Sequence, residues 1–296
     1  MQVTQQILLV VNPVSAHKDK TEIVKSIKSL VRLQGKDVLF YRTTGKDDKI
    51  KVRELIEKNQ NIERIIAIGG DGTIKLIAEA MTISSIPMGI VPMGSSNAMA
   101  VNLGISLDVR EAIKTAFGNA FIIIDSIQID GELCLHMSDF GLNAALIKNY
   151  EESKFRGKIG YLLQSIPTLL KSDYPYSFTV KTGDEEINED GVLLVIANAQ
   201  KYGTGANVNP KGKLNDQFYE ILIFKSLNAM EILKTLRNEE ALDPNFVKTI
   251  SVKEAKIICK NPVHFQIDGE YRGEKDYIET SLSKQRYRIA IPMKNK

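Results

Sequence analysis

The sequence is poor in the residues that disulfide-rich proteins and zinc sites require. Its 296 residues include only two cysteines and three histidines. Cys134 and Cys259 both fall within apparent strands, which indicates buried, reduced thiols rather than a disulfide. No second cysteine or histidine stands at metal-ligand spacing from His17, so a zinc site of that type is not expected.

Long apolar runs and an excess of charge of one sign are also missing. No run approaches the ~18 apolar residues that span a bilayer, and the first residues lack the pattern of a signal peptide. We therefore expect a cytoplasmic protein whose membrane contact is peripheral. The net charge of +3, from 39 basic and 36 acidic residues, comes without a dense basic stripe, so no nucleic-acid partner is predicted.

Several common catalytic motifs are absent. There is no Walker A sequence and no complete GxGxxG, which argues against P-loop and dinucleotide-binding proteins. Residues 138–141 read Ser-Asp-Phe-Gly, but no His-Arg-Asp catalytic loop accompanies this string, so we interpret it as strand and turn. No histidine lies in a recognisable nucleophile setting, so a Ser-His-Asp hydrolase is not expected.

The strongest positive signal is the stretch Gly-Gly-Asp-Gly-Thr at residues 69–73, directly after the apolar run 65–68. Glycine tolerates positive φ and lets a backbone approach a ligand, and the amides of such a turn form an anion site with the following helix N-terminus. Asp71 would place a carboxylate beside a metal ion or a hydroxyl proton. An ordinary strand-to-helix turn is the alternative interpretation.

Four apolar runs, at residues 7–11, 38–41, 64–68 and 88–91, alternate with segments of helical spacing. This pattern predicts a Rossmann-like α/β domain with a parallel sheet, in which ligands bind beyond the carboxyl ends of the strands. The loops after these strands carry our candidate phosphate-binding residues: Asn12, Ser15, Thr43, Gly69, Gly70, Asp71, Gly72, Thr73, Gly94, Ser95 and Asn97. Ser95, Ser96 or Asn97 also fits as the cap of a helix through Ala98.

From about residue 121 the pattern changes to alternating or continuous β runs, which predicts a C-terminal β-sandwich domain. We assign residues 1–122 to the α/β domain and 123–296 to the sandwich. The predicted strands are 122–129, 133–137, 177–181, 192–197, 218–224, 247–258, 264–267 and 286–291, with 183–191 as a solvated turn region. An apolar helix at 160–170 is either a core helix or a lid.

Four motifs together resemble the catalytic family of diacylglycerol kinases and sphingosine kinases, in its bacterial lipid kinase form. They are Asn12-Pro13-x-Ser15, the 69–73 stretch, Pro92-x-Gly94-Ser95-x-Asn97-Ala98-x-Ala100 and Asp268-Gly269-Glu270, in the order seen in that family. The resemblance covers nearly the whole chain. It implies an ATP-dependent lipid kinase that transfers the γ-phosphoryl group to the hydroxyl of a lipid such as diacylglycerol or a long-chain base.

The tripeptide Asp268-Gly269-Glu270 has a twin in Asp130-Gly131-Glu132, and both predict hairpin turns. The resemblance favours the later copy as catalytic. Glu270 would accept the proton of the substrate hydroxyl, while Asp268 and Asp71 would organise the metal or share the role of base. The residues alone do not rank these carboxylates.

The resemblance further implies a structural Mg²⁺ held by Asp216 and by the main-chain carbonyls of Lys213 and Phe218. Relatives usually carry glycine after this aspartate, where this chain has Gln217. One carboxylate in a polar loop is by itself a weak signal for a hard cation, so this site depends on the resemblance.

Further positions depart from the family pattern and leave alternatives open. Lys75 and Leu76 stand where the commonest bacterial pattern has Asn and Glu, and Asn143 stands where relatives often carry Asp. The alternatives are an NAD-kinase-like kinase of a soluble acceptor, and a catalytically inactive homologue that binds nucleotide or lipid. The expected partners are ATP, Mg²⁺ and a lipid at a membrane surface, which the cationic residues 154–158 could contact; a homodimer stays open.

Overall fold

The computed structural model describes residues 4–15, 19–81, 85–141, 143–144, 175–202, 205–226, 234–235 and 242–293. His17, the cationic residues 154–158 and the predicted helix 160–170 lie outside these ranges. The chain divides into two compact units, Met1–Ile124 with Gln285–Lys296, and Asp125–Lys284.

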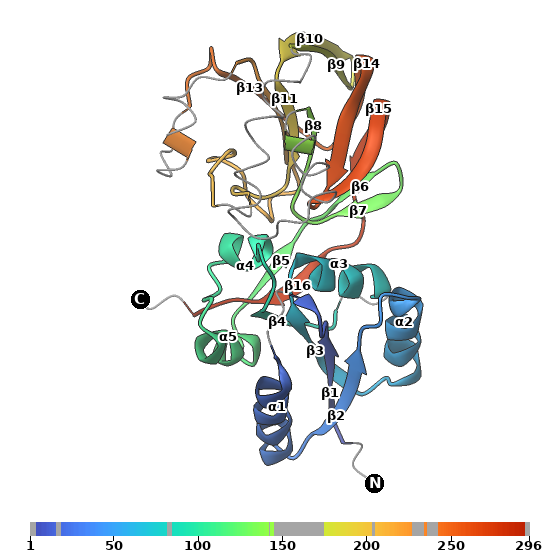
Figure 1. Cartoon of the computed structure of the whole chain (residues 1–296), viewed down its shortest axis with the longest axis vertical. Coiled ribbons are helices and arrows are strands. Elements are labelled where there is room, and N and C mark those ends of the chain that lie inside the picture. Colours follow the sequence, from blue (N-terminus) through green and yellow to red (C-terminus); the bar gives the residue numbers. More distant parts are fainter. Residues whose placement is uncertain are drawn as a thin grey trace. The chain divides into compact units, whose positions relative to one another are not determined.

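The first unit is built on a sheet in which the predicted parallel strands are neighbours (Figure 1). The strands lie in the order β2-β1-β3-β4-β16-β5. Their bounds are β1 Gln6–Val11, β2 Asp37–Arg42, β3 Ile62–Gly69, β4 Met88–Pro92, β5 Phe121–Ile124 and β16 Tyr287–Ala290. Strands β1 to β4 pair in parallel, so their carboxyl ends and the loops that follow lie at one edge. The predicted Rossmann-like sheet is confirmed.

Helices cover both faces of this sheet (Figure 1). They are α1 Thr21–Leu33, α2 Asp48–Lys58, α3 Asp71–Ala80, α4 Ala98–Asn102 and α5 Val109–Ala116. Helix α1 buries Val24, Ile27 and Val31, which follow three-four spacing, against Ile7 and Leu9 of β1. Strand side chains alternate between faces, and α3 contacts β1 and β3 from the opposite side.

The chain returns to the first sheet near its end. Strand β16 pairs with β4 in parallel and with β5 in antiparallel fashion, and Ile289 and Ala290 are buried there. Because this pairing ties residues 285–296 to the first unit, the division differs from our assignment of all of 123–296 to the second domain. The apolar spacing of 286–291 predicted the strand, but it carried no sign of the sheet that the strand joins.

The second unit is an antiparallel, sandwich-like β structure, as predicted (Figure 1). Its strands are β6 Ile127–Ile129, β7 Glu132–Cys134, β8 Met137–Gly141, β9 Tyr176–Thr182, β10 Glu185–Gly191, β11 Leu193–Ala197, β12 Tyr219–Phe224, β13 Val247–Val252, β14 Glu254–Ile267 and β15 Glu270–Leu282. They follow the order β13-β12-β11-β8-β14-β15-β6-β7, with β9 joining β10 to β14. The central strands β8, β11 and β14 carry the residues discussed below.

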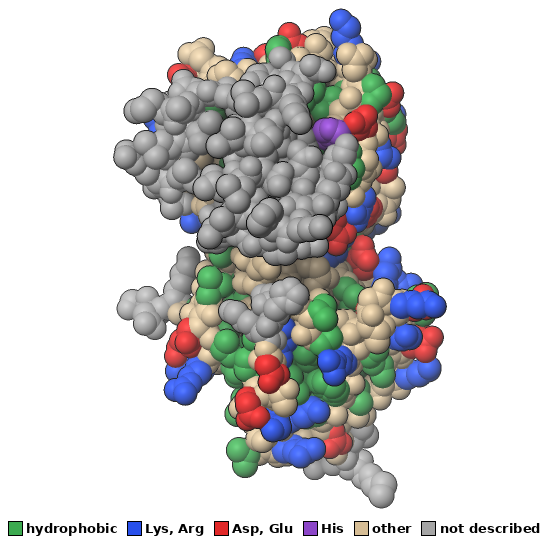
Figure 2. Space-filling view, viewed as in Figure 1, with side chains coloured by type: hydrophobic (Ala, Val, Ile, Leu, Met, Phe, Trp, Pro, Cys, Tyr) green, Lys and Arg blue, Asp and Glu red, His purple; other side chains and the backbone are tan. Residues whose placement is uncertain are grey.

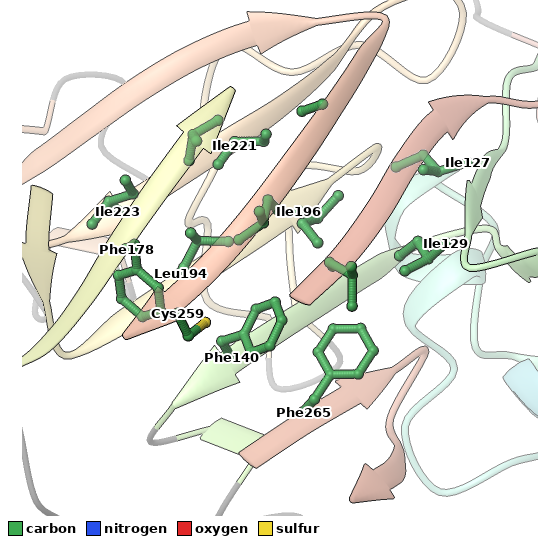
Figure 3. Packing of buried hydrophobic residues seen from close by; sticks show 14 of the residues in the cluster. Ile127, Ile129, Phe140, Phe178, Leu194, Ile196, Ile221, Ile223, Cys259 and Phe265 are labelled. Carbon is green, nitrogen blue, oxygen red and sulfur yellow. The ribbon is translucent and has the colours of Figure 1, made fainter. Parts of the chain in front are cut away.

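The core of the second unit is formed by alternate residues of several strands (Figure 3). Phe140 of β8 and Phe265 of β14 face each other with ring centroids 4.5 Å apart. Cys259 and Cys134 are both buried in this core, and they form no disulfide with each other, as expected. Because Phe140 points into this core, its neighbour Asp139 points to the other face of the sheet.

The strand predictions for the second half were wrong in detail at several places. Residues 247–258, expected as one strand, form β13 and the first part of β14. Residues 122–129 form two strands in different sheets, because the chain passes from the first unit to the second between Ile124 and Asp125. Residues 185–191, expected as turns, form β10, whose acidic side chains face solvent while its backbone pairs with β9. Strand β15 was missed because its charged sequence hides a long hairpin partner of β14.

The described surface carries charges of both signs, and the described helices are not of the membrane-spanning type. On the face drawn in Figure 2, basic and acidic side chains are interspersed over the described residues. Among the described helices, none is both long and apolar enough to span a membrane.

Candidate functional site

Two glycine loops at the carboxyl edge of the first sheet touch through their backbones. A Cβ atom added to Gly94 would lie 2.4 Å from the Cα of Gly70, and one added to Gly70 would lie 2.9 Å from the Cα of Gly94. A Cβ on Gly69 would lie 2.2 Å from Thr73 Oγ1, a buried hydroxyl without a hydrogen-bond partner among the described residues. The absence of side chains therefore lets the loops after β3 and β4 meet.

Asp71 joins the same two loops. It is the first residue of α3, and its carboxylate accepts hydrogen bonds from the backbone amides of Ala98 and Met99, each at 2.9 Å. These amides belong to the first turn of α4, which has no side-chain cap of its own. A carboxylate at this position satisfies amides that the helix leaves unpaired. Asp71 thus fixes α4 relative to the glycine turn.

The loop after β4 is closed by Asn97. Its side-chain amide accepts from the Gly94 amide at 2.7 Å and donates to the Gly94 carbonyl at 2.9 Å. Asn97 adopts φ 56°, a left-handed conformation that asparagine tolerates better than most residues. Our prediction that Ser95, Ser96 or Asn97 caps α4 through its side chain was wrong, because Asp71 supplies that cap from another loop; Ser95 and Ser96 are exposed.

Ser15 and Asn12, after β1, also reach this edge. Ser15 Oγ donates to the carbonyl of Met93 at 3.0 Å, and the Asn12 amide donates to the carbonyl of Ile68 at 3.1 Å. Lys20, which is 5% exposed, donates from Nζ to the Ser15 carbonyl at 2.7 Å. Sequence reasoning missed Lys20, since nothing in its spacing separates it from the other lysines near α1.

Thr43 follows β2 and is held by a backbone hydrogen bond to Val11 at 2.9 Å. The loop beyond it is organised by Asp48, which accepts from the amides of Thr44 and Gly45 and from the Tyr41 hydroxyl. Burial opposes ionisation of Asp48, but these hydrogen bonds outweigh it and lower its pKa. All four loops therefore begin at one edge of the first sheet, as the sequence predicted.

In the second unit, Asp268 occupies a hairpin turn between β14 and β15. Asp268 has φ 52° and Gly269 has φ 85°, the left-handed pair that a tight hairpin needs. The Asp268 carboxylate accepts from the amides of His136 at 2.9 Å and Leu135 at 3.1 Å. Asp268 thereby ties its turn to the connection between β7 and β8.

Glu270 leaves this turn with an exposed side chain and shares an arginine with the twin tripeptide. Arg272 Nη2 donates to Glu270 Oε2 at 2.6 Å and to Glu132 Oε1 at 2.6 Å, and Nε donates to Glu132 Oε2 at 2.8 Å. Hydrogen bonds with Glu132 are the largest influence that raises the pKa of Arg272. Both tripeptides are hairpin turns, as predicted, since Asp130 and Gly131 are also left-handed.

The predicted magnesium ligands lie in one turn before β12. Asp216 Oδ1 accepts from the Phe218 amide at 3.2 Å. Gln217 between them adopts φ 62°, a left-handed conformation that glycine adopts without strain. Among the described residues no three acidic, histidine or cysteine side chains form a metal cluster. An aspartate with the carbonyls of Lys213 and Phe218 is an oxygen-only set, which suits a hard cation.

Two further residues contact this region through hydrogen bonds. Asp125 is buried and its Oδ2 accepts from the Gln217 amide at 2.7 Å. Asn198, fully buried, donates from Nδ2 to the carbonyl of Asp125 at 2.8 Å and to that of Leu135 at 3.3 Å. Asn198 therefore connects the turn at Asp216 to the backbone that holds Asp268. In the sequence, the only signal for this role was the position of Asn198 directly after the apolar run 193–197.

The sequence matches two family models in succession. The model described as "Diacylglycerol kinase catalytic domain" matches residues 6–129, and that described as "YegS C-terminal NAD kinase beta sandwich-like domain" matches residues 137–282. A protein of Klebsiella pneumoniae named "Probable lipid kinase YegS-like" is 27% identical over 270 residues, which cover 89% of this chain and 88% of that protein. A protein of Shigella dysenteriae named "Probable lipid kinase YegS" is 27% identical over 269 residues, covering 88% and 89%.

Solved structures share the fold. A diacylglycerol kinase from Bacillus anthracis superposes with a TM-score of 0.73 at 17% identity, covering 99% of each chain. An NAD kinase from Archaeoglobus fulgidus in complex with ATP gives a TM-score of 0.55 at 13% identity, covering 97% of this chain and 94% of that one. At these identities the likeness extends to the fold, and it is stronger for the lipid kinase than for the NAD kinase.

Proposed function

Because the chain belongs to the lipid kinase family that carries the diacylglycerol kinase catalytic domain, we propose that it transfers the γ-phosphoryl group of ATP to the hydroxyl of a lipid. Diacylglycerol and long-chain bases are the acceptors to test first. The reaction joins the acceptor oxygen to the γ-phosphorus, releases ADP and passes the hydroxyl proton to a base.

The observation that carries this proposal is the meeting of the loops after β1, β3 and β4. Asp71 fixes the start of α4, while the contact of Gly70 with Gly94 brings two stretches of backbone together. Backbone amides at glycine turns and helix starts favour phosphate oxygens. In this proposal Asp71 positions the phosphate-binding loops instead of serving as the base.

Glu270 is our candidate for the base. Its carboxylate is exposed, and Arg272 restrains one of its oxygens. Both oxygens of Asp268, by contrast, accept backbone amides, so Asp268 is better suited to holding the turn. A positioned carboxylate can accept the hydroxyl proton while phosphoryl transfer itself depends on orientation and charge neutralisation.

Mg²⁺ would be held by Asp216 with the carbonyls of Lys213 and Phe218, and when bound it would supply a positive charge that stabilises this turn. Titration of the protein with Mg²⁺ alone in a calorimeter tests this site. The wild type should bind, and Asp216→Asn should weaken binding by about tenfold or more. Unchanged affinity in that variant would place the ion elsewhere.

We also propose that the protein works in the cytoplasm at the membrane surface, where its lipid acceptor lies. Homodimers are a further proposal, which sedimentation measurements test. Flotation with vesicles of neutral and of anionic lipids tests the membrane contact. If the protein floats with neither kind of vesicle, the membrane contact is contradicted.

Incubation with γ-labelled ATP tests the function as a whole. One reaction contains diacylglycerol or sphingosine in mixed micelles, and a parallel reaction contains NAD without lipid or detergent. Label in the lipid, lost in Glu270→Gln, supports the proposal. Label in NAD would favour the soluble-acceptor alternative, and label in neither, with ATP still bound, would favour the inactive homologue.

A further inference from the structure

Asp139 lies in the middle of β8 with its side chain fully buried. It is paired with Val195 of β11 on one side and with Gln266 of β14 on the other. The sequence placed it in a string that we interpreted as strand and turn. That secondary structure is confirmed, yet a strand needs no buried carboxylate, and burying one is costly unless it has partners.

The contacts of this carboxylate are concentrated on one oxygen. Oδ2 accepts from Gln266 Nε2 at 2.5 Å, from Asn143 Nδ2 at 2.6 Å and from the Tyr202 hydroxyl at 2.9 Å. The other oxygen, Oδ1, is also buried. Asn143 donates to this carboxylate, a role that an ionised aspartate at the same position could not fill.

Gln266 transmits the position of Asp139 to the turn that follows β14. An ionised carboxylate only accepts hydrogen bonds, so the Gln266 amide must present its NH₂ group to Asp139. Its oxygen, Oε1, then faces the other way and accepts from the amide of Gly269 at 2.7 Å. Gly269 is the central glycine of the turn between Asp268 and Glu270.

We propose that Asp139 is a positioning residue, which acts through Gln266 to fix the orientation of the turn that carries Asp268 and Glu270. Its catalytic consequence rests on the proposed function, whereas the relay from Asp139 to Gly269 does not. A neutral group at position 139 can donate as well as accept hydrogen bonds, so it no longer requires the Gln266 amide to present its NH₂ group. The Gly269 amide then loses its assured acceptor, and the turn loses one of its anchors.

The relay depends on pH in a range that can be measured. Burial raises the pKa of Asp139 to about 6, against the lowering effect of hydrogen bonds from the side chains of Asn143, Gln266 and Tyr202 and from the backbone amide of Ala144. Of these partners only Tyr202 is titratable. In the connection before β8, His136 contacts the carbonyl of Lys201, while His264 of the neighbouring strand β14 pairs with Glu274 of β15. At pH values above the pKa of Asp139, its carboxylate is charged and fixes the hydrogen bonds from Asp139 through Gln266 to Gly269. At lower pH this relay is lost.

Nuclear magnetic resonance of the whole chain tests the relay without any substrate. Labelling with ¹³C-carbonyl aspartate and ¹⁵N-glycine selects the Asp–Gly pairs, which end at Gly72, Gly131, Gly191 and Gly269. We expect the Gly269 amide to shift with a midpoint near the pKa of Asp139, about 6. The Gly131 amide, in the twin tripeptide, should show no such transition. A Gly269 amide that does not titrate between pH 5 and 8 overturns the proposal.

Two variants separate the relay from a merely structural role. Tyr202→Phe removes one hydrogen bond to the carboxylate without touching Gln266, so the midpoint should move to higher pH. Asp139→Asn should abolish the Gly269 transition. A transition unchanged in either variant contradicts the relay; if Asp139→Asn does not fold, Tyr202→Phe alone decides.

Lipid phosphorylation supplies the catalytic readout. In the wild type kcat should fall at pH values below the pKa of Asp139; we call this fall the acid limb. Tyr202→Phe should keep kcat within twofold at pH 8. Asp139→Asn should lose about tenfold in kcat at pH 8 and should show no acid limb. An acid limb retained in Asp139→Asn excludes a positioning role. A wild type that labels no lipid while Gly269 still titrates refutes the proposed function and leaves the relay standing.

Discussion

Glu132 and Glu270 hold the same guanidinium group, that of Arg272. Glu132 binds it through both oxygens, at 2.6 and 2.8 Å, whereas Glu270 binds it through one, at 2.6 Å. The two hydrogen bonds from Arg272 to Glu132 fix the orientation of the guanidinium group, because paired hydrogen bonds restrain its plane. The earlier tripeptide thus restrains the carboxylate of the later one, a link invisible in the sequence.

Replacing Arg272 with alanine should lower kcat for lipid phosphorylation by about tenfold, or ~1.4 kcal/mol in activation free energy. Glu270 would keep its charge but lose the donor that restrains its side chain. The free energy of unfolding should change by only about 1 kcal/mol, because the pair is partly exposed. Steady-state kinetics with urea unfolding measure both effects.

Lys275→Ala is the matched control for Arg272. Lys275 lies 3.6 Å from Asp130 of the twin tripeptide, also at a partly exposed pair. It should leave kcat within twofold of the wild type. Equal losses of kcat in the two variants would show that the effect comes from surface charge and not from the orientation of Glu270.

Asp71→Ala should cost about 1 kcal/mol of stability, the usual value of a lost helix cap, and should also abolish measurable ATP binding. The stability loss follows from the amides of Ala98 and Met99, which would have no carboxylate to accept their hydrogen bonds. ATP binding should fall because α4 and the glycine loops would no longer be held together. Fluorescent nucleotide titration checks this expectation.

Asp108→Ala separates these two effects. Asp108 caps α5 by accepting from the amides of Arg110 and Glu111, at 3.0 and 3.1 Å, but it joins no second loop. Its loss should cost a similar free energy of unfolding and leave ATP affinity unchanged. If Asp108→Ala weakens ATP binding as much as Asp71→Ala does, general destabilisation explains both.

Gly94→Ala should destabilise the protein by about 1–3 kcal/mol, the range found for overpacked sites. The new Cβ would meet the backbone of Gly70, which has no flexible side chain to move aside. Gly72→Ala is the steric control, since its Cβ would have no atom within 4 Å and the residue lies in α3. It should stabilise the helix by roughly 0.5–1 kcal/mol. Equal unfolding midpoints for the two variants would contradict the tight contact.

The sequence was sufficient to predict β1, β3 and β4 because these strands are buried on both faces and read as continuous apolar runs. Leu8 and Leu9, for example, are both fully buried although they point to opposite faces. Strand β15 could not be predicted in the same way, since about half of its side chains are charged and its partner lies across a hairpin. Its pairing is specified by the Asp268-Gly269 turn, not by its own pattern.

Individual residues of the site could be predicted from their type, whereas contacts between residues far apart in the sequence could not. The glycines at 70 and 94 were visible one by one, but their mutual contact depends on the pairing of β3 with β4. The cap of α4 was assigned to its own loop because local capping is the usual rule, whereas Asp71 reaches it from 27 residues away. Long-range hydrogen bonds leave no periodic signal.

Asp139→Asn should make the protein relatively more stable as the pH rises. The folded protein binds this proton with a pKa of about 6, whereas the ordinary value is 3.8, so the carboxyl stabilises the fold below about pH 4 and loses that contribution as the pH rises through 6. The difference in unfolding free energy between variant and wild type should therefore shift by roughly 3 kcal/mol in favour of the variant between pH 4 and 8.

Asp48→Asn serves as the control of opposite sign. Burial opposes the charge of Asp48, but hydrogen bonds from Tyr41, Thr44 and Gly45 prevail and lower its pKa. Its contribution to stability is present at neutral pH and is lost on acidification. Asp48→Asn should therefore lose stability relative to the wild type at pH 7, and less so near pH 3. The same direction of change in both variants would contradict the assignment of Asp139.

Gln217→Gly should stabilise the turn before β12 by about 1 kcal/mol, because a left-handed residue with a Cβ atom is strained by roughly that amount. Gln217 has φ 62°, and its amide still donates to Asp125 in the glycine variant, since that hydrogen bond uses only the backbone. Gln217→Ala is the matched control: it removes the same side chain beyond Cβ but leaves the strain, so it should give no gain. Urea unfolding of the three proteins measures the difference. A gain shared by alanine and glycine would mean that the glutamine side chain, and not the backbone conformation, is what the turn tolerates poorly.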